Sequence, residues 1–228
     1  MKPLKNKCDG VSCFLCSRCL KDWIPSIDAN KTCIQFKKGE LLFREGDPVT
    51  GIYFVFSGTV KVHKKWGEDK ELIVRFAKGG DIVGHRGLGK DMHYPIAATA
   101  LEMVKVCFIP LDFFWTTIKV NQHFTEKLLL FYAEELQESE RNMRNLAHMQ
   151  VKGRIAYSLL LLKDKFGLDK EGVLHIELSK QDFASYIGAA YETVFRIMNE
   201  LADEKIIKAT GRKITIYDPG KLSLLIQP

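Results

Sequence analysis

Cysteines near the N-terminus have the spacing of metal ligands. Two residues separate Cys13 from Cys16 and Cys16 from Cys19, and Cys8 lies five residues before Cys13. Two-residue spacings let successive thiolates converge on one centre, which is how iron–sulfur clusters are commonly held. Zinc uses the same thiolates. One further ligand is usual, and the candidates for it are Cys8 and Cys107.

The same cysteines are compatible with other sensors. The chain has six cysteines and no secretory signal, which favours metal binding or thiol redox sensing over structural disulfides. A protein that binds an unidentified small molecule and no metal is a further interpretation. Cys33, in the apolar run of residues 33–36, is expected to be a small buried side chain.

A second group of functional side chains lies in residues 179–204, which are expected to form two short helices around Gly188. In the second helix, one buried face is predicted from residues at helical spacing, namely Val194, Ile197, Met198 and Leu201. The opposite face carries Glu192 and Arg196. Arginine can donate two hydrogen bonds to guanine, and a carboxylate can accept one from cytosine. The pattern therefore predicts a helix that reads DNA bases, although an exposed ion pair between Glu192 and Arg196 has the same spacing.

The residues that follow this helix favour the same interpretation. Two β-branched runs, residues 206–207 and 214–217, flank a Gly-Arg-Lys turn, which is typical of a β-hairpin wing. Ser179 is placed to cap the first helix. The residues predicted to contact DNA are Ser179, Lys180, Gln181, Tyr191, Glu192, Thr193, Phe195, Arg196, Arg212 and Lys213.

Three kinds of element must position these side chains. Short β-rich runs separated by glycine and polar turns occupy residues 32–109 and predict a jelly roll or barrel. A helix about 40 Å long is predicted from residue 121 to residue 149, where no Gly or Pro interrupts the chain. A helix over residues 151–166 and a strand over residues 173–176 are expected before the reading helices.

The long helix has an apolar stripe, while charged residues such as Glu134 and Glu135 are assigned to its outer face. Such a stripe usually packs against a partner helix, and packing on its own barrel is the alternative. The predicted interface residues are Leu128, Tyr132, Leu136, Ser139, Met143 and Leu146, among which Ser139 interrupts the apolar pattern.

Four motifs occur in a consistent order along nearly the whole chain. They are K-G-E-L-L-F-R-E-G-D at 38–47, Y-F-V-F-S-G-T-V-K-V at 53–62, G-R-I-A at 153–156 and E-T-V-x-R at 192–196. On these motifs the chain resembles the Crp/Fnr family of bacterial transcription regulators. The resemblance implies an α+β fold with a double-stranded β-helix (jelly-roll) sensory domain, a long dimerisation helix and a C-terminal winged helix-turn-helix.

The resemblance also implies a division of the chain and a function. The expected parts are a cysteine-rich segment (1–20), a cyclic-nucleotide-binding-like β-barrel (21–120), the dimerisation helix (121–149) and the DNA-binding domain (150–228). The expected protein is a cytoplasmic homodimer that binds palindromic double-stranded DNA in response to an effector and contacts RNA polymerase. Tyr191 stands where the cyclic-AMP receptor branch has arginine, so a different base preference is expected.

The resemblance bears on the effector as well. Cys107 stands where the oxygen-sensing Fnr branch places its distant cluster cysteine, which favours a [4Fe-4S] cluster on Cys13, Cys16, Cys19 and either Cys107 or Cys8. The Fnr branch, however, has a longer gap before its third cysteine.

The cyclic-AMP-binding pattern contains a glutamate and a phosphate-binding arginine, and His85 and Pro95 stand at these positions. Because an anionic phosphate needs a paired cation, this departure argues against cyclic AMP. Another small molecule could occupy the predicted effector pocket, which consists of Gly84, His85, Arg86, Ala97 and Thr99.

Composition is consistent with a DNA-binding protein of two domains. No apolar run approaches the roughly 18 residues that a membrane span requires, and the net charge of +6 suits a polyanionic partner. A metal-dependent enzyme on a jelly-roll scaffold would need clustered His and Glu ligands on adjacent strands. The barrel histidines lack that paired spacing, so no enzymatic activity is expected.

Overall fold

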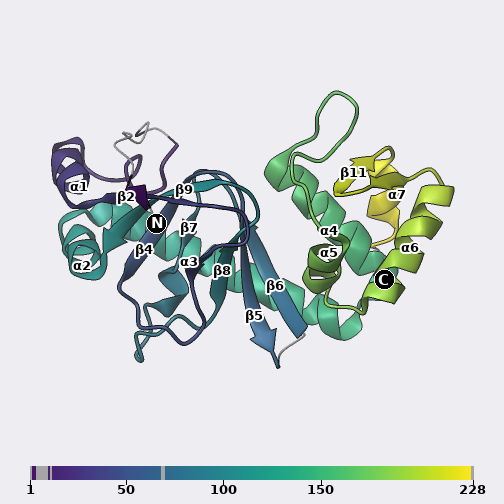
Figure 1. The fold of residues 1–228 in the computed structure, drawn as a ribbon, viewed down its shortest axis with the longest axis horizontal. Helices are drawn as coiled ribbons and strands as arrows, with labels where there is room; N and C mark the ends of the chain where they lie inside the picture. Colours follow the sequence, from purple (N-terminus) through teal and green to yellow (C-terminus); the bar gives the residue numbers. More distant parts are fainter. Residues whose placement is uncertain (1, 4–9, 11, 68–69, 227–228) are drawn as a thin grey trace. The chain divides into compact units, whose positions relative to one another are not determined.

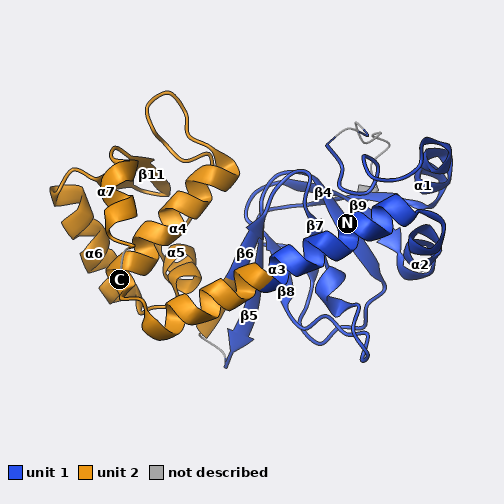
Figure 2. Ribbon diagram, turned by 180° about the vertical axis from the view of Figure 1, so that it is seen from behind, with its two compact units in different colours: residues 1–69, 74–136 blue, residues 70–73, 137–228 orange. Residues whose placement is uncertain are grey.

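The computed structural model describes residues 2–3, 10, 12–67 and 70–226 of the chain, so Cys8, a predicted ligand, lies outside the described residues. The chain divides into two compact units (Figure 2). The first contains residues 1–69 and 74–136, and the second contains residues 70–73 and 137–228.

The described strands between Lys2 and Pro110 form two β-sheets (Figure 1). The first sheet has the order β1 (Lys2–Pro3), β2 (Thr32–Phe36), β9 (Val104–Pro110), β4 (Gly51–Ser57) and β7 (Ile82–Val83). The second has the order β3 (Leu41–Phe43), β8 (Ala97–Ala100), β5 (Val60–Trp66) and β6 (Lys70–Ala77). The pairs β2·β9, β4·β9, β3·β8 and β5·β8 are antiparallel, and this arrangement confirms the predicted jelly-roll class.

The core of the first unit is rich in aromatic rings. Phe54 of β4 is fully buried, and its ring lies 6.5 Å from that of Phe114 and 6.4 Å from that of Phe14. Phe114 belongs to α2 (Leu111–Val120), which, like η1 (Lys21–Trp23) and α1 (Ile24–Asn30), is not predicted by the sequence patterns. Aromatic pairs of this kind add to the stabilisation that area burial gives.

The long helix α3 (Gln122–His148) and helix α4 (Val151–Phe166) confirm the predicted helices at 121–149 and 151–166. The second unit continues with α5 (Lys180–Ile187), α6 (Tyr191–Asp203), the hairpin β10 (Ile207–Thr210) and β11 (Lys213–Ile216), and α7 (Pro219–Leu224). The predicted strand at 173–176 is wrong. These residues make only isolated bridges, such as Val173 to Thr215, because Gly172, at a φ of 81°, turns the chain as it reaches the wing.

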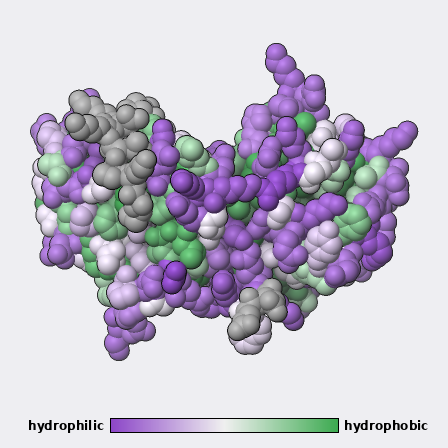
Figure 3. Space-filling model, viewed as in Figure 1, coloured by the Kyte–Doolittle hydropathy of each residue, from purple (hydrophilic) through white to green (hydrophobic). Residues whose placement is uncertain are grey.

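None of the helices in the described part of the chain is long and apolar enough to cross a membrane. The face of the molecule in Figure 3 is predominantly hydrophilic, and its apolar residues appear as separate patches.

Gly51 permits the closest approach between β4 and β9. A Cβ at this position would fall against the carbonyl oxygen of Ile109 and the ring of Phe108. We expect Gly51→Ala to lower the free energy of unfolding by about 1–3 kcal/mol, as overpacking of a core does. Gly89→Ala is the matched control because a Cβ at Gly89 meets nothing within 4 Å. Equal urea midpoints for the two variants would contradict the expectation.

Candidate nucleic-acid interface and sensory residues

Helix α5 begins and ends at residues suited to those positions. The Ser179 hydroxyl oxygen accepts a hydrogen bond of 2.9 Å from the backbone N–H of Asp182, which confirms the predicted N-cap. Gly188 ends the helix with a φ of 68°, a left-handed conformation that favours glycine. The turn to α6 is therefore fixed by local chemistry, and the Ser179 side chain is engaged within the domain.

Helix α6 buries the face that its sequence predicts. Val194, Ile197, Met198 and Leu201 are all at most 7% exposed. Tyr191 and Phe195, by contrast, are more than a third exposed although both are aromatic. Large apolar side chains left on the open face of a helix are typical of a recognition surface.

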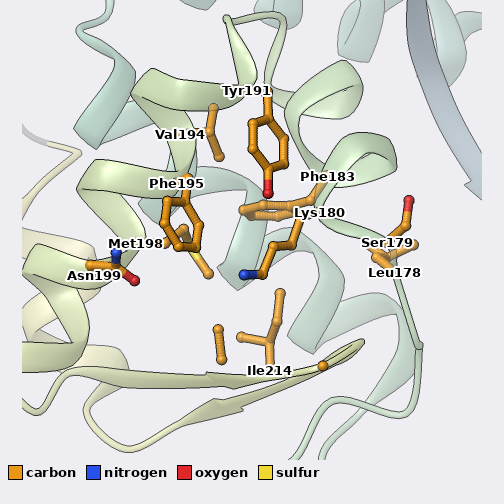
Figure 4. A pocket seen from close by; sticks show the side chains of 12 residues that line it. Leu178, Ser179, Lys180, Phe183, Tyr191, Val194, Phe195, Met198, Asn199 and Ile214 are labelled. Atoms are coloured by element: carbon orange, nitrogen blue, oxygen red, sulfur yellow. The ribbon is translucent and has the colours of Figure 1, made fainter.

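The two exposed rings form an ordered surface together with a cation. The rings of Tyr191 and Phe195 are parallel within 3°, with centroids 6.0 Å apart. Lys180 Nζ lies 4.1 Å from the centroid of the Phe195 ring, in the range of a cation–π contact. Figure 4 shows these three side chains beside Ile214 of the wing, around a cavity of about 60 Å³. The start of α5, the face of α6 and the wing thus meet at one place.

Arg196 has a different acidic neighbour from the one expected. Its Nη1 pairs with Glu200 Oε1, one turn further along α6, whereas the sequence interpretation paired it with Glu192. An exposed pair at this spacing contributes about 0.2–0.5 kcal/mol. A bidentate contact to a base contributes about 1–3 kcal/mol of discrimination, so the weaker pair with Glu200 would leave Arg196 available for such a contact. Glu192 is exposed in the first turn of α6.

The wing presents exposed cations. Gly211, with a φ of 61°, forms the turn between β10 and β11, and Arg212 and Lys213 follow it on the surface. Lys213 Nζ lies 3.9 Å from Glu177 Oε1. The remaining predicted DNA contacts, Gln181 and Thr193, are exposed and half-buried respectively.

The predicted dimer residues of α3 fall into two groups. Leu128 is 5% exposed and belongs to the core of the first unit. The Tyr132 hydroxyl donates a hydrogen bond of 2.6 Å to the carbonyl oxygen of His85. Ser139 is half-buried. Three apolar residues stay open to solvent, namely Leu136 at 61%, Met143 at 60% and Leu146 at 39%.

Leu129, which the sequence interpretation did not include, is 70% exposed. Leu129, Leu136 and Met143 are spaced by seven residues, and Tyr132, Ser139 and Leu146 follow them by three. This is a heptad pattern. The apolar stripe of α3 therefore begins at Leu129, one residue after the core residue Leu128.

The sequence interpretation assigned Glu135 to the outer face of the helix, whereas the structure places it in a network of charged side chains. Its carboxylate lies 2.8 Å from Arg75 Nη1, 2.7 Å from Arg86 Nη2 and 3.7 Å from His85 Nε2. Burial alone would raise the pKa of Glu135, but contact with His85 and the charges of Arg75 and Arg86 hold it far below its usual range. The network ties α3 to β6 and to η2 (His85–Gly87).

The predicted effector-pocket residues are thus engaged in two separate groups of contacts. His85 and Arg86 face Glu135. On β8, Thr99 Oγ1 lies 2.8 Å from His63 Nε2, and Ala97 is buried. Gly84, with a φ of 89°, precedes η2. The guanidinium that a bound anion would need is already paired with a protein carboxylate.

The cysteine segment packs on the first unit. Phe14 and Leu15 are buried, and the Phe14 ring lies 5.2 Å from that of Phe131. Cys13 and Cys16 are consequently only 6% and 7% exposed. Burial, together with the nearby Cys13 thiol, raises the pKa of Cys19 to about 12.

Lys31 interacts electrostatically with both Cys107 and Cys16, after the larger effects of its burial and of Asp28. The predicted ligands Cys16 and Cys107 therefore lie near one ammonium group. Among the described residues, no three His, Cys, Asp or Glu side chains come close enough to hold a metal ion.

The chain matches two protein-family models. One is described as a cyclic nucleotide-binding domain and matches residues 33–121, and the other is described as a Crp-like helix-turn-helix domain and matches residues 153–225.

Curated relatives and a solved structure agree with these matches. The transcriptional activator protein Anr of Pseudomonas protegens is 29% identical over 191 residues, which cover 83% of this chain and 78% of that protein. The cAMP-activated global transcriptional regulator CRP of Escherichia coli is 30% identical over 181 residues, which cover 77% and 85%. The structure of FixK2 from Bradyrhizobium japonicum matches with a TM-score of 0.78 and 25% identity, and the match covers 87% of this chain and 98% of that one.

Acidification is expected to destabilise the protein through His85. Burial lowers the pKa of this 2% exposed imidazole to about 4. The unfolded chain then binds the proton more readily, so stability is fully present above the ordinary pKa of about 6.5 and falls as the pH drops towards 4. We expect a loss of about 2 kcal/mol in the free energy of unfolding between pH 7 and pH 5.

Urea unfolding at each pH measures this loss, and His85→Gln should remove most of it. The matched control is His123→Gln, which changes an exposed histidine and should leave the pH dependence unchanged. A wild-type slope that survives in His85→Gln would assign the titration to another group.

Proposed function

Because the chain belongs to the Crp/Fnr family and is a DNA-binding transcription regulator, we propose that α6 reads its operator and that the N-terminal cysteines control it. Regulators of this family bind DNA through the helix-turn-helix and act as dimers, and they are not enzymes. Their sensory domains bind cyclic nucleotides or iron–sulfur clusters.

One observation carries the proposal that α6 binds DNA: the open face of this helix lies beside the wing. Arg196 and Glu192 supply the donors and the acceptor that base edges need, and Tyr191, Thr193 and Phe195 lie next to them. Lys180, Gln181, Arg212 and Lys213 flank this face and would contact phosphates, while Ser179 orients α5. Phosphate contacts set the position of the helix, and base contacts set its sequence preference.

A homodimer would place two such DNA-binding domains on a palindromic DNA site. The exposed heptad residues Leu129, Leu136 and Met143 support α3 as the interface, because an apolar stripe of this spacing is normally covered by a second helix. Two α6 helices would enter successive major grooves one helical turn apart. We place this protein in the cytoplasm with its DNA, in contact with RNA polymerase. Within each chain, the proposed parts remain residues 1–20, 21–120, 121–149 and 150–228.

A [4Fe-4S] cluster is the proposed sensory group. The chemistry of the donors fits it, because Cys13, Cys16, Cys19 and Cys107 supply four thiols from two segments of one unit, and the charge of Lys31 reaches both segments. The described thiols do not converge closely enough to hold a single metal ion, so binding of a cluster would have to draw the two segments together. When bound, the cluster would supply oxygen-labile redox chemistry.

The protein's own residues then link the sensory unit to α3. Cys107 lies on β9, next to β4 in the sheet, and the network of Glu135, Arg75 and Arg86 joins α3 to the same unit. A regulator without metal, which binds another small molecule at Gly84, His85, Arg86, Ala97 and Thr99, is the second candidate. For a small anion, binding there would require Arg86 to exchange Glu135 for the ligand.

Removal of the base-reading guanidinium tests the proposal for α6. A duplex pool with a randomised centre first yields the preferred site, and gel shifts then compare the site with each of its single-pair variants. We expect Arg196→Ala to lose about 1–3 kcal/mol and to relax the preference at one base pair in each half-site. The matched control, Arg212→Ala, should weaken binding evenly over all sequences because it removes a phosphate contact. An even loss in Arg196→Ala would contradict base reading.

Anaerobic purification tests the proposed cluster. We expect a brown protein that contains iron and sulfide and that bleaches in air. Cys16→Ser should lose the iron, whereas Cys33→Ser, which keeps every proposed ligand, should retain it. A colourless wild-type protein without iron or sulfide would rule out the cluster and leave the small-molecule candidate.

A further inference from the structure

Cys33 and Cys107 form a pair of thiols across two neighbouring strands. They lie directly opposite each other in the antiparallel ladder of β2 and β9. Their Sγ atoms are 3.9 Å apart. The sequence interpretation treated Cys33 only as a small buried side chain, because the pairing of residues 74 positions apart depends on strand register.

The register of the pair is compatible with a covalent bond. Directly opposite residues of an antiparallel pair have Cα atoms about 4.5–5.5 Å apart, within the range of about 4.4–6.8 Å found in disulfides. The two sulfurs would have to approach from 3.9 Å to about 2 Å, which side-chain rotation can provide without moving the strands.

The surroundings of the two thiols are different, and the difference gives each a role. Cys33 is half-buried and within reach of solvent, whereas Cys107 is only 5% exposed. Peroxide therefore reaches the more accessible Cys33 sulfur first, and the buried Cys107 is placed to react with it afterwards.

We infer that Cys33 and Cys107 form a hydroperoxide-sensitive dithiol that closes to a disulfide. The Cys33 thiolate attacks one peroxide oxygen, so that an S–O bond forms, the O–O bond breaks and one water leaves after protonation. The Cys107 thiolate then attacks the sulfenic sulfur, so that the S–S bond forms and a second water leaves. Two thiols and one hydrogen peroxide give one disulfide and two waters, and the two electrons pass from sulfur to peroxide.

The disulfide would have two consequences for this chain. It would join β2 covalently to β9, and it would withdraw Cys107 from any other ligand. Oxidation of the pair and ligation of a cluster by Cys107 therefore exclude each other, but the dithiol itself needs no bound metal. The protein would respond to peroxide by a route that does not use Cys13, Cys16 or Cys19.

Peptide mapping of the full-length wild-type protein tests the inference without any substitution. The anaerobically purified protein is freed of any iron with a chelator and then receives one equivalent of hydrogen peroxide. Remaining thiols are blocked with iodoacetamide, and the unreduced digest is examined by mass spectrometry. We expect a Cys33–Cys107 cross-linked peptide that disappears on treatment with dithiothreitol. Alkylated Cys33 and Cys107 after peroxide, or Cys107 linked to a different cysteine, would overturn the inference.

One substitution tests the assigned roles. Cys107→Ser should trap Cys33 as a sulfenic acid, detected as a dimedone adduct that is on the order of tenfold more abundant than in the wild type. An absence of dimedone adduct in Cys107→Ser would overturn the role of Cys33.

Iron and sulfide analysis of the same sample separates this inference from the proposed cluster. A cross-link in protein that never contained iron supports the dithiol and contradicts the cluster. An iron-loaded protein that is stripped of its iron and still gives no cross-link supports the cluster and overturns the dithiol.

Discussion

A half-buried carboxylate on α3 has to be neutralised, and this constraint holds the helix on the first unit. Glu135 would be costly to remove from water without partners, and Arg75 and Arg86 supply the opposite charges from two different segments of the barrel. The Tyr132 hydroxyl adds a hydrogen bond to the backbone at His85, one helical turn before Glu135. Loss of Glu135 would leave Arg75 and Arg86 without this counter-charge, so the helix and the barrel are held together by charge as well as by packing.

In this arrangement one face of α3 packs on the core of the first unit, and another face is exposed to solvent. Leu128 and Tyr132 face the core, whereas Leu129, Leu136 and Met143 face outwards. The same helix also continues into the second unit. If His85 and Arg86 bind the effector, as in the second candidate, their movement would act directly on the helix through Glu135, without a separate connecting segment.

Local sequence patterns correctly predicted the elements whose apolar residues repeat regularly or whose ends carry a capping residue. Helix α4, the buried face of α6 and the Ser179 cap follow from neighbours within four residues, which the sequence displays directly. Glu135 could not be placed in this way, because its partners Arg75 and Arg86 are distant in the chain. The pairing of Cys33 with Cys107 depends on strand register, and the two-residue strand β7 is too short to show any period. Leu128 lies in the core, whereas its neighbour Leu129 is exposed and belongs to the proposed dimer interface. Local periodicity does not show which of two adjacent leucines lies on which face of the helix.

The pairing of Arg196 with Glu200 would separate the two parts of the proposed DNA affinity by their response to salt. Exposed cations such as Arg212 would bind phosphate with release of condensed counterions, so their contribution would weaken steeply as ionic strength rises. Arg196 already has a carboxylate as its counter-ion, and its transfer to a base exchanges one partner for another within the interface. Base discrimination by α6 would then persist at ionic strengths where general attraction to DNA has faded, so concentrated salt would favour the cognate site over the rest of the chromosome.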